Sequence, residues 1–329
     1  MKDNIPVFIA SDDNYAPHVA SLIASIMSNT SPFIEFYILS DGISNINKTK
    51  IIALQERFSD CSIEFIDIDM SVFSEFKIGV NMQNGDYITL ATFNRYLIPE
   101  LKPQIDRAIY LDPDIIVLRD IKLLWETDME NYALAAVADL NIPTKIYQKE
   151  RTALQLSSQH VYFNAGVLLI DCKKWRENNI TNRLFEIDEQ TRNISIYNDQ
   201  STLNKCFNNN YKWLDSKFNT LTEAIDGKIN RKIAYLSGLP EDYIERQTQE
   251  MIIRHFNGGF SKPWQTDKVM GYIPLKNADD FWKYMKMTKF YDEVRQKFEI
   301  TNPQQIKMAL SSLHYIHKRL REDKKNKQI

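Results

Sequence analysis

Glycine is scarce in this chain, with nine among 329 residues, and only Gly258 and Gly259 are adjacent. Loops that hold phosphates with their backbone need closely spaced glycines, yet neither G-x-x-x-x-G-K-[ST] nor G-x-G-x-x-G occurs. A P-loop and a dinucleotide-binding fingerprint are therefore excluded. If the protein binds a nucleotide diphosphate, a metal ion and side chains must hold it.

Cysteine and long apolar runs are also sparse. The three cysteines, Cys61, Cys172 and Cys206, form no zinc-binding or thioredoxin-like spacing, so a reducing, cytoplasmic setting is expected. Apolar stretches such as residues 161–163 and 166–170 are far too short to span a bilayer. The first residues show no apolar signal-peptide segment with a cleavage site.

Charge is nearly balanced but unevenly placed. The net charge of −2 argues against a general nucleic-acid-binding protein. Residues 305–329 contain seven Lys or Arg and two acidic residues, a net charge of +5, which leaves −7 on the other 304 residues. This basic tail has apolar residues at helical spacing. It can lie peripherally on the anionic inner face of a membrane, or be a solvated C-terminal helix.

Apolar periodicity predicts an α/β fold. The first third alternates between strand-like and helical patterns, at residues 5–10, 19–27, 33–39, 44–58 and 62–68, with Ser44 as a helix N-cap. Such alternation indicates a mostly parallel sheet that binds ligands at the carboxyl ends of its strands. Further strands are expected at 108–111, 115–118, 133–137 and 165–170, and further helices at 181–191, 199–207 and 278–284. We expect one α/β domain over residues 1–270 and a helical C-terminal region over residues 271–329.

Asp112 and Asp114 give the sequence its most pointed feature. They flank Pro113 in a short turn between two apolar strands. Two carboxylates this close repel each other unless a cation lies between them, and Mg²⁺ or Mn²⁺ fits because it can also bind a diphosphate. An isolated D-x-D is more often a solvated turn, but the apolar flanks place this one at the end of a buried strand.

His255 and Lys262 extend the cation-binding pattern. His255 follows an apolar run and is a candidate third ligand, and an imidazole shifts the metal preference from Mg²⁺ toward Mn²⁺. Lys262 would place positive charge near a departing phosphate. A lone histidine is more often structural, and the glycines between these two residues can mark only a turn.

Five segments together resemble glycosyltransferase family 8, and within it the bacterial lipopolysaccharide or lipooligosaccharide α-galactosyl- and α-glucosyltransferases. They occur in family order and are ASDDNY (10–15), RAIYLDPDIIVLRD (107–120), YFNAGVLLI (162–170), YNDQ (197–200) and HFNGGFSKPW (255–264). The resemblance implies a GT-A fold for residues 1–270, a mostly parallel sheet flanked by helices. It also implies UDP-galactose or UDP-glucose as the donor and a saccharide or glycolipid as the acceptor.

The resemblance further implies a role for each matched position. The residues that would hold Mn²⁺, or Mg²⁺, against the diphosphate are Asp112, Asp114 and His255. Those that would contact the uridine are Asp12, Asn14 and Tyr15, and those that would contact the diphosphate are Gly258 and Lys262. Those that would surround the transferred sugar are Arg95, Asp139, Asn164, Asp199 and Gln200.

Several of these residues have a purely structural interpretation as well. Asp12 and Asp13 can cap the following helix, and Tyr15 can be a core residue at the helix start. Arg95 can be an ion-pairing residue of a surface helix. Asn164 can be a strand-end turn former.

Two features depart from the family pattern. The spacing from His255 to Lys262 is one residue longer than usual, which leaves open whether Gly258 or Gly259 contacts the diphosphate. Tyr87 stands where related galactosyltransferases commonly carry a histidine near the acceptor. The identity of the acceptor therefore does not follow from the resemblance.

The expected reaction transfers a hexose with retention of the α-configuration, through an oxocarbenium-like transition state. A double displacement would need a carboxylate nucleophile, but the family position best placed for it is Gln200, and an amide is a poor nucleophile. The neighbouring Asp199 would bind sugar hydroxyls instead. Attack of the acceptor from the front face is therefore the preferred route.

Two other functional classes fit parts of the sequence. A strand that ends in D-x-D also begins the aspartyl-phosphate hydrolases of the haloacid dehalogenase type. Those enzymes usually carry the motif on their first strand, whereas here it lies past residue 110, and no G-D-x-x-x-D follows it. The second alternative is a module that binds UDP-sugar or glycan without turnover.

Overall fold

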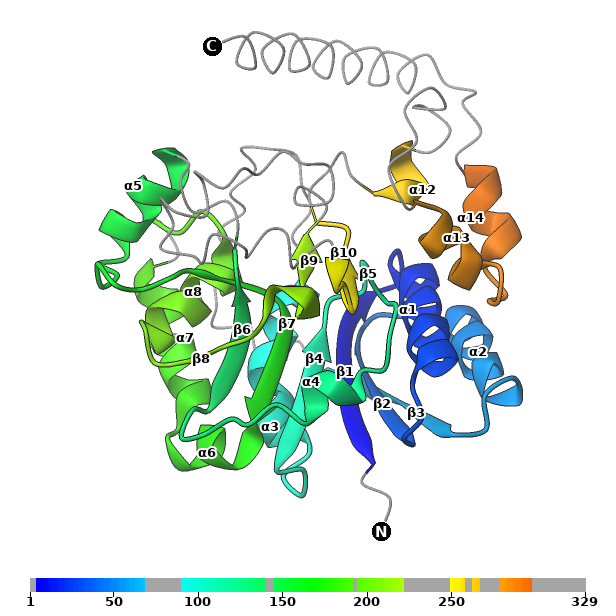
Figure 1. Ribbon diagram of the computed structural model, residues 1–329, viewed down its shortest axis with the longest axis horizontal. Coiled ribbons are helices and arrows are strands. Elements are labelled where there is room, and N and C mark those ends of the chain that lie inside the picture. Colours follow the sequence, from blue (N-terminus) through cyan, green and yellow to red (C-terminus); the bar gives the residue numbers. More distant parts are fainter. Residues whose placement is uncertain are drawn as a thin grey trace, which may run out of the picture.

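The computed structural model describes residues 4–68, 90–139, 145–191, 194–221, 249–257, 262–266 and 278–297. Over these ranges, a seven-stranded sheet of order β3-β2-β1-β4-β7-β6-β8 forms the centre of the molecule (Figure 1). A three-stranded sheet of order β5-β10-β9 accompanies it. The mixed α/β architecture with a mostly parallel sheet confirms the predicted fold class.

The N-terminal part confirms the predicted alternation of strands and helices. β1 (Ile5–Asp12), β2 (Ile34–Asp41) and β3 (Cys61–Asp67) are parallel, and α1 (Ala16–Asn29) and α2 (Asn45–Ile52) connect them. Ser44 caps α2 as predicted, because its Oγ accepts a hydrogen bond from the Asn47 N–H at 3.3 Å. After residue 52 the chain narrows into a 3₁₀ helix, η1 (Ala53–Glu56), where a regular helix to residue 58 was expected.

The Asp-Pro-Asp turn joins the two sheets. β4 (Arg107–Leu111) lies parallel to β1, whereas β5 (Ile115–Val117) leaves the large sheet. In the small sheet β5 pairs antiparallel with β10 (Ile253–His255), and β9 (Thr220–Leu221) completes it. His255 pairs with Ile115 in this register, so the last residue of β10 comes next to Asp114.

One strand of the large sheet runs against the others. β7 (Phe163–Asp171) is antiparallel to both of its neighbours, β4 and β6 (Leu134–Ala138), while β8 (Lys212–Trp213) is parallel to β6. The start of β7 therefore lies at the same edge of the sheet as the ends of β4 and β6. This edge gathers the polar residues that follow or begin those strands.

The other helical segments cover the sheet or extend from it. They are η3 (Leu90–Leu97), α3 (Ile98–Leu101), α4 (Lys122–Trp125), α5 (Lys145–Ala153), α6 (Cys172–Glu177), α7 (Ile180–Thr191), α8 (Asn198–Phe207), η4 (Ser216–Phe218), α12 (Pro263–Thr266), α13 (Ala278–Met285) and α14 (Tyr291–Lys297). α13 lies beside α1 (Figure 1), where Asn29 donates a hydrogen bond to the Tyr284 hydroxyl at 2.9 Å. The basic tail 305–329 and the expected boundary at residue 270 lie outside the described residues.

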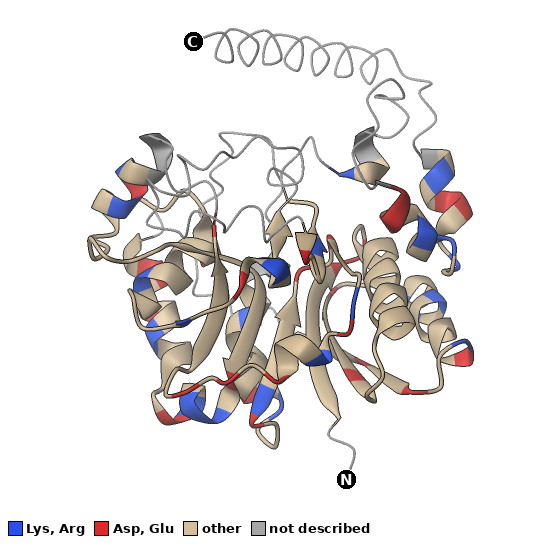
Figure 2. Ribbon diagram, in the orientation of Figure 1, with Lys and Arg blue, Asp and Glu red and all other residues tan. Residues whose placement is uncertain are grey.

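The apolar core lies on both faces of the large sheet. Along β1, Val7 and Ile9 belong to one buried cluster, and Phe8 and Ala10 belong to a second one. Full burial of a valine, isoleucine or phenylalanine side chain stabilises the fold by about 1.5–3 kcal/mol. Charged residues lie mainly on helices and loops and at strand ends (Figure 2). The three cysteines are free thiols, as expected from their spacing.

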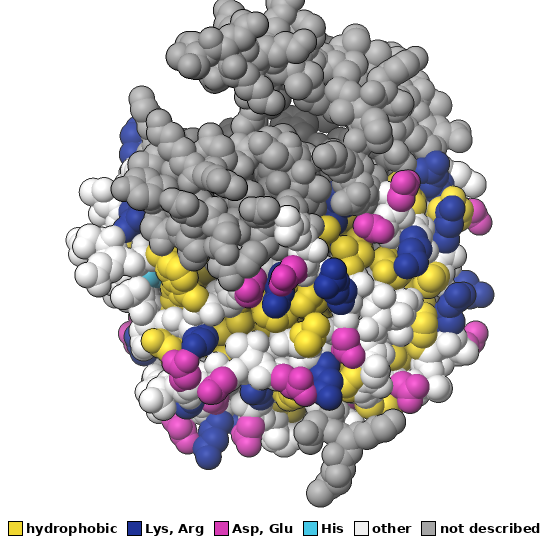
Figure 3. Space-filling model, viewed as in Figure 1, with side chains coloured by type: hydrophobic (Ala, Val, Ile, Leu, Met, Phe, Trp, Pro, Cys, Tyr) yellow, Lys and Arg dark blue, Asp and Glu magenta, His cyan; other side chains and the backbone are white. Residues whose placement is uncertain are grey.

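The exposed hydrophobic side chains of the described part are spread over several elements. None of its helices is both long and apolar enough to cross a bilayer. Figure 3 shows apolar side chains between charged ones on one face of the molecule. The large exposed hydrophobic residues come from separate elements and are Ile46, Ile52, Leu123, Ile194, Ile196 and Trp213. Single exposed hydrophobic residues are common on soluble and peripheral proteins alike and indicate no docking surface by themselves.

Candidate active site

The three predicted metal ligands come together where the two sheets meet. The ligand atoms of Asp112, Asp114 and His255 all lie within 4.8 Å of one another. His255 Nε2 is 3.2 Å from Asp114 Oδ1 and 3.9 Å from Asp112 Oδ2. Burial alone would lower the pKa of His255, but the charges of Asp114 and Asp112 raise it above its usual value. The two carboxylates therefore stabilise a positive charge beside them, and a bound metal ion would supply such a charge.

Asn219 fixes the orientation of His255. Asn219, fully buried before β9, lies with its Oδ1 3.0 Å from His255 Nδ1. The Asn219 amide nitrogen donates to Asn164 Oδ1 at 2.8 Å, which identifies the amide oxygen as the partner of the histidine. His255 Nδ1 therefore carries the proton, and Nε2 is left to bind a metal.

Gly166 keeps space open at the same point. It lies in β7, and its carbonyl accepts a hydrogen bond from the Asp112 N–H at 2.8 Å. A Cβ at this position would lie 2.3 Å from His255 Cε1 and 2.8 Å from Asp112 Oδ2. No side chain can therefore stand beside these two ligands without displacing one of them.

The donor set fits a divalent cation. Two carboxylates supply hard oxygen ligands suited to Mg²⁺ or Mn²⁺, and the imidazole favours Mn²⁺. The three ligand atoms converge from one turn and one strand end, and Gly166 leaves their approach clear. Both the chemistry and the shape of the site are compatible with a divalent metal ion.

Arg95 is buried at the centre of the site, with 5% of its surface exposed. Its Nη2 lies 3.1 Å from Asp112 Oδ1, its Nε 3.1 Å from Asp199 Oδ2, and its Nη1 donates to the Ala165 carbonyl at 2.6 Å. The guanidinium also lies over the ring of Tyr110, 4.5 Å from its centroid. The interpretation of Arg95 as a surface residue is wrong, because η3 packs this side chain into the interior.

The predicted sugar-binding residues form one connected cluster beside the metal ligands. Gln200 donates through Nε2 to Asp139 Oδ2 at 3.0 Å and accepts from the Ala165 N–H at 3.0 Å. Asn164 donates to the same Asp139 oxygen at 3.4 Å. Burial, opposed by Arg95, raises the pKa of Asp199 to about 7. Hydrogen bonds thus hold Asp139, Asn164 and Gln200 in one arrangement at the edge of the sheet.

Of the residues predicted to contact the uridine and diphosphate, Tyr15 and Lys262 are linked to Asp114. Lys262 Nζ donates to the Tyr15 hydroxyl at 2.8 Å and to Asp114 Oδ2 at 2.9 Å. Asp12 accepts a hydrogen bond from the Tyr15 N–H at 3.0 Å, which supports its structural role at the start of α1. Asn14 follows β1 and is exposed.

Some contacts differ from the sequence-based expectations. The Asp13 side chain accepts hydrogen bonds from the Ser44 N–H and the Asn47 amide, both at 2.8 Å, and so links the start of α1 to the start of α2. The ring of Tyr15 packs against the core, so this residue has a structural part as well. Gly258, Gly259 and Tyr87 lie outside the described residues.

Two residues of the site were not predicted. Gly166 stands inside a motif of the sequence, but its role depends on a Cβ-sized space that only the fold defines. Asn219 lies outside all five motif segments, and nothing in the sequence around it indicates that it contacts His255.

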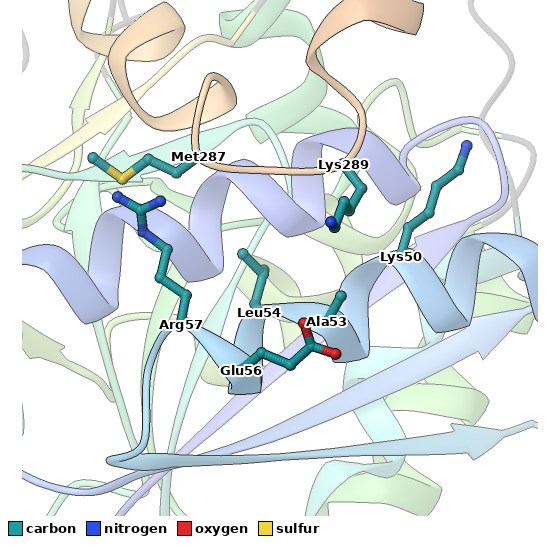
Figure 4. A pocket seen from close by; sticks show the side chains of 7 residues that line it. All are labelled: Lys50, Ala53, Leu54, Glu56, Arg57, Met287 and Lys289. Carbon is teal, nitrogen blue, oxygen red and sulfur yellow. The ribbon is translucent and has the colours of Figure 1, made fainter.

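A separate cavity of about 300 Å³ lies between η1 and the loop that joins α13 to α14 (Figure 4). It is lined by Lys50, Ala53, Leu54, Glu56, Arg57, Met287 and Lys289. None of these residues is a predicted site residue. Lys50 is already paired with Glu293 at 2.9 Å, so we place no part of the reaction there.

Comparison with known proteins identifies the family. Residues 6–268 match the sequence profile of glycosyl transferase family 8. The chain belongs to this family. The family membership assigns the Asp-x-Asp motif to a glycosyltransferase rather than to a phosphohydrolase.

Related sequences agree with this assignment. A Haemophilus influenzae protein that bears the name of a glycosyltransferase is 36% identical over 197 residues, covering 60% of this chain and 57% of that protein. General stress protein A of Bacillus subtilis is 29% identical over 299 residues, covering 88% of this chain and 96% of that protein. The chain thus spans about half the length of the first relative and nearly all of the second.

A solved structure shares the fold. The galactosyltransferase LgtC, in complex with donor and acceptor sugar analogues, superposes with a TM-score of 0.71 and 27% sequence identity. The match covers 87% of this chain and 96% of LgtC. The family 8 chain therefore has the GT-A fold that the resemblance implied.

Proposed function

We propose that this family 8 glycosyltransferase transfers galactose or glucose from a UDP-sugar to a saccharide acceptor, with retention of the α-configuration. The convergence of Asp112, Asp114 and His255 beside the buried cluster of Arg95, Asp139 and its partners supports this proposal. In this proposal a metal-bound diphosphate would lie next to hydrogen-bonding groups that would hold a sugar.

Asp112, Asp114 and His255 would hold Mn²⁺, with Mg²⁺ as the alternative ion. When bound, the ion supplies positive charge to the diphosphate leaving group. Lys262 adds a second positive charge from the opposite side of Asp114, where it would contact the diphosphate together with Gly258. Asp12, Asn14 and Tyr15 would contact the uridine.

The buried cluster would orient the transferred sugar. Arg95, Asn164, Asp139, Asp199 and Gln200 offer donors and acceptors for its hydroxyls. The Gln200 amide is neutral and already bonded to Asp139 and to the Ala165 N–H, which suits a role in binding better than nucleophilic attack. We therefore propose front-face attack. The acceptor oxygen bonds to the anomeric carbon, the bond from that carbon to the phosphate oxygen breaks, and the departing phosphate takes the acceptor proton.

The acceptor would be a saccharide or glycolipid used in lipopolysaccharide or surface glycan synthesis. A cytoplasmic enzyme with its basic tail 305–329 on the anionic inner face of the membrane would meet such a substrate. Co-sedimentation with anionic vesicles tests this part of the proposal. The full chain is expected to pellet, and the chain without residues 305–329 is expected to remain in solution.

The product of donor turnover tests the proposed reaction. The protein is incubated with UDP-galactose or UDP-glucose and a panel of saccharides, and proton NMR reads the anomeric configuration of the new linkage. An α-linked product from one donor is expected. Asp114→Asn should abolish it, whereas Asp106→Asn, which removes an exposed carboxylate paired with Arg176, should not. A β-linked product, or turnover retained in Asp114→Asn, would contradict the proposal.

A further inference from the structure

Glu150 is a buried carboxylate that has no place in the chemistry described above. It lies on α5, with 1% of its surface exposed. Its Oε1 accepts hydrogen bonds from the backbone N–H groups of Ile196 at 3.1 Å and Tyr197 at 3.4 Å, and from the Ser201 hydroxyl. A helix distant in sequence therefore holds the turn that leads into α8.

That turn has a strained backbone. Asn198, the first residue of α8, has φ of +45°, in the left-handed region that costs most residues about 1–2 kcal/mol. Asparagine tolerates this conformation better than most side chains, but it still persists only where surrounding contacts hold it. Tyr197, the N-cap of α8, makes no side-chain capping bond of its own. Glu150 therefore accepts the hydrogen bonds of backbone N–H groups at the start of a helix that has no side-chain cap of its own.

Two residues of the sugar site follow this turn directly. Asp199 pairs with Arg95, and Gln200 bonds to Asp139 and to the Ala165 N–H. A change in the backbone at Asn198 would rotate both side chains, since they are the next two residues of the same helix turn.

Hydrogen bonds also connect Glu150 to Asp139 through Ser201 and Tyr162. The Ser201 hydroxyl, bonded to Glu150, lies 3.0 Å from the Tyr162 hydroxyl and accepts from the Tyr197 N–H at 3.2 Å. The Tyr162 carbonyl accepts from the Asp139 N–H at 2.9 Å. Glu150 thus connects α5, the turn before α8 and, through Ser201, Tyr162, which lies directly before β7.

We propose that Glu150 is a positioning residue that holds the Tyr197–Asn198 turn so that Asp199 and Gln200 meet the donor sugar. The inference rests on the proposed sugar-transfer function. The inference separates two parts of donor binding. The sugar end depends on Glu150, whereas at the uridine and diphosphate end Lys262 bonds to Tyr15 and Asp114.

The test compares kcat for UDP release with the Kd of UDP, measured by calorimetry with Mn²⁺. A misplacement of about 1 Å costs roughly 100-fold in rate, so Glu150→Ala is expected to lower kcat by about that factor. The Kd of UDP should stay within about twofold of the wild-type value. Glu150→Gln keeps an oxygen acceptor for the two N–H groups and should retain most of the wild-type kcat. If Glu150→Ala does not fold, Glu150→Asp, which withdraws the carboxylate by one methylene, should show the same split.

His160 provides a matched control, because it contacts α8 near the C-terminal end of that helix. It is also 1% exposed, and it holds α8 through Asn204 and the chain beyond the helix through the Asn209 N–H. His160→Leu should leave kcat near the wild-type value if the turn, rather than general anchoring of α8, sets the site.

The outcomes separate this inference from the proposed function. Wild-type kcat in Glu150→Ala, an equal loss in His160→Leu, or a loss of UDP affinity that matches the loss of kcat would each overturn the positioning role while leaving the transferase proposal intact. Absence of turnover in the wild-type protein with either donor would overturn the transferase proposal and the positioning role with it.

Discussion

Gly166 leaves the space that the candidate metal site needs, because glycine has no side chain. The residue sits in β7 between two candidate ligands, and its Cβ would overlap His255 and press on Asp112. Gly166→Ala is expected to weaken Mn²⁺ binding by at least 10- to 100-fold, the range typical for disturbed ligand orientation. Electron paramagnetic resonance of free Mn²⁺ measures this directly.

Gly42 is the matched control for this substitution. It has φ of +72° and no atom within 4 Å of an added Cβ, so Gly42→Ala strains only the backbone. This variant is expected to lose about 1–2 kcal/mol of stability and to bind Mn²⁺ like the wild type. Equal Mn²⁺ affinity in Gly166→Ala and Gly42→Ala would show that the space at Gly166 is unimportant.

Lys262 and a metal ion would compete for Asp114. Its Nζ lies 2.9 Å from Asp114 Oδ2, and this contact to a charged group is worth about 1.5–3 kcal/mol. Without nucleotide, Lys262→Met is therefore expected to bind Mn²⁺ about tenfold more tightly than the wild type. With UDP present, Lys262→Met should bind Mn²⁺ more weakly than the wild type, because the diphosphate has lost the positive charge of Lys262.

Mn²⁺ titrations with and without UDP test this reversal. Lys174→Met serves as the control. Lys174 lies on α6 and pairs at 3.2 Å with Asp171, the last residue of β7, whereas the site lies at the start of that strand. Weaker Mn²⁺ binding by Lys262→Met in both titrations would contradict the competition.

Residue types and spacing pointed to the candidate metal ligands, but not to the residues that orient them. Asp112 and Asp114 are separated by a single residue in the sequence, and His255 stands in a recognisable motif. Asn219 reaches His255 only because β9 pairs with β10. Such a contact depends on strand pairing, which one sequence does not specify.

At the scale of single elements, α8 is anchored by a histidine that is best suited to the neutral state. His160 Nε2 lies 2.9 Å from Asn204 Oδ1, whose amide nitrogen donates elsewhere, while Nδ1 accepts from the Asn209 N–H at 2.7 Å. If Nδ1 were protonated, its N–H group would face the Asn209 N–H group, and neither could accept a hydrogen bond. Burial lowers the pKa of His160 to about 4.

This shift makes the fold sensitive to acid. Below pH 6.5 the unfolded chain binds a proton at His160 that the folded chain does not accept until about pH 4. Stability from this residue is therefore complete above pH 6.5 and is lost as the pH falls toward 4, by about 3 kcal/mol in total. Urea unfolding of wild type and His160→Leu at pH 7 and pH 4.5 tests it. The wild type should lose more stability than the variant, and parallel losses would contradict this explanation.

Element types followed from apolar periodicity, but their directions and sheet membership did not. The strands expected at 108–111 and 115–118 exist, yet the second belongs to another sheet. The strand expected at 165–170 runs antiparallel, which periodicity cannot indicate. η3 carries Arg95 inward because Phe93, Tyr96 and Leu97 bury the same segment.

At the scale of the whole molecule, the candidate site connects the two sheets. Asp112 follows β4 of the large sheet, and His255 ends β10 of the small one. A ligand that joins these groups should stabilise the entire fold. At 100 times its Kd, a ligand that binds only the folded state adds about 2.7 kcal/mol.

Thermal unfolding measures this stabilisation. Mn²⁺ and UDP together are expected to raise Tm by roughly 5 °C, and by more than the sum of their separate effects. Asp114→Asn should remove the extra stabilisation. Additive effects of the two ligands would indicate that they bind at separate places.

The central claim is that Asp112, Asp114 and His255 form the metal site of a UDP-sugar transferase. The most direct measurement is UDP release from UDP-galactose and UDP-glucose by the wild-type protein, with Mn²⁺ and with EDTA. Release from one donor that requires Mn²⁺ and is restored when Mn²⁺ replaces EDTA is the expected result. Equal release in EDTA, or none from either donor with Mn²⁺, would contradict the claim.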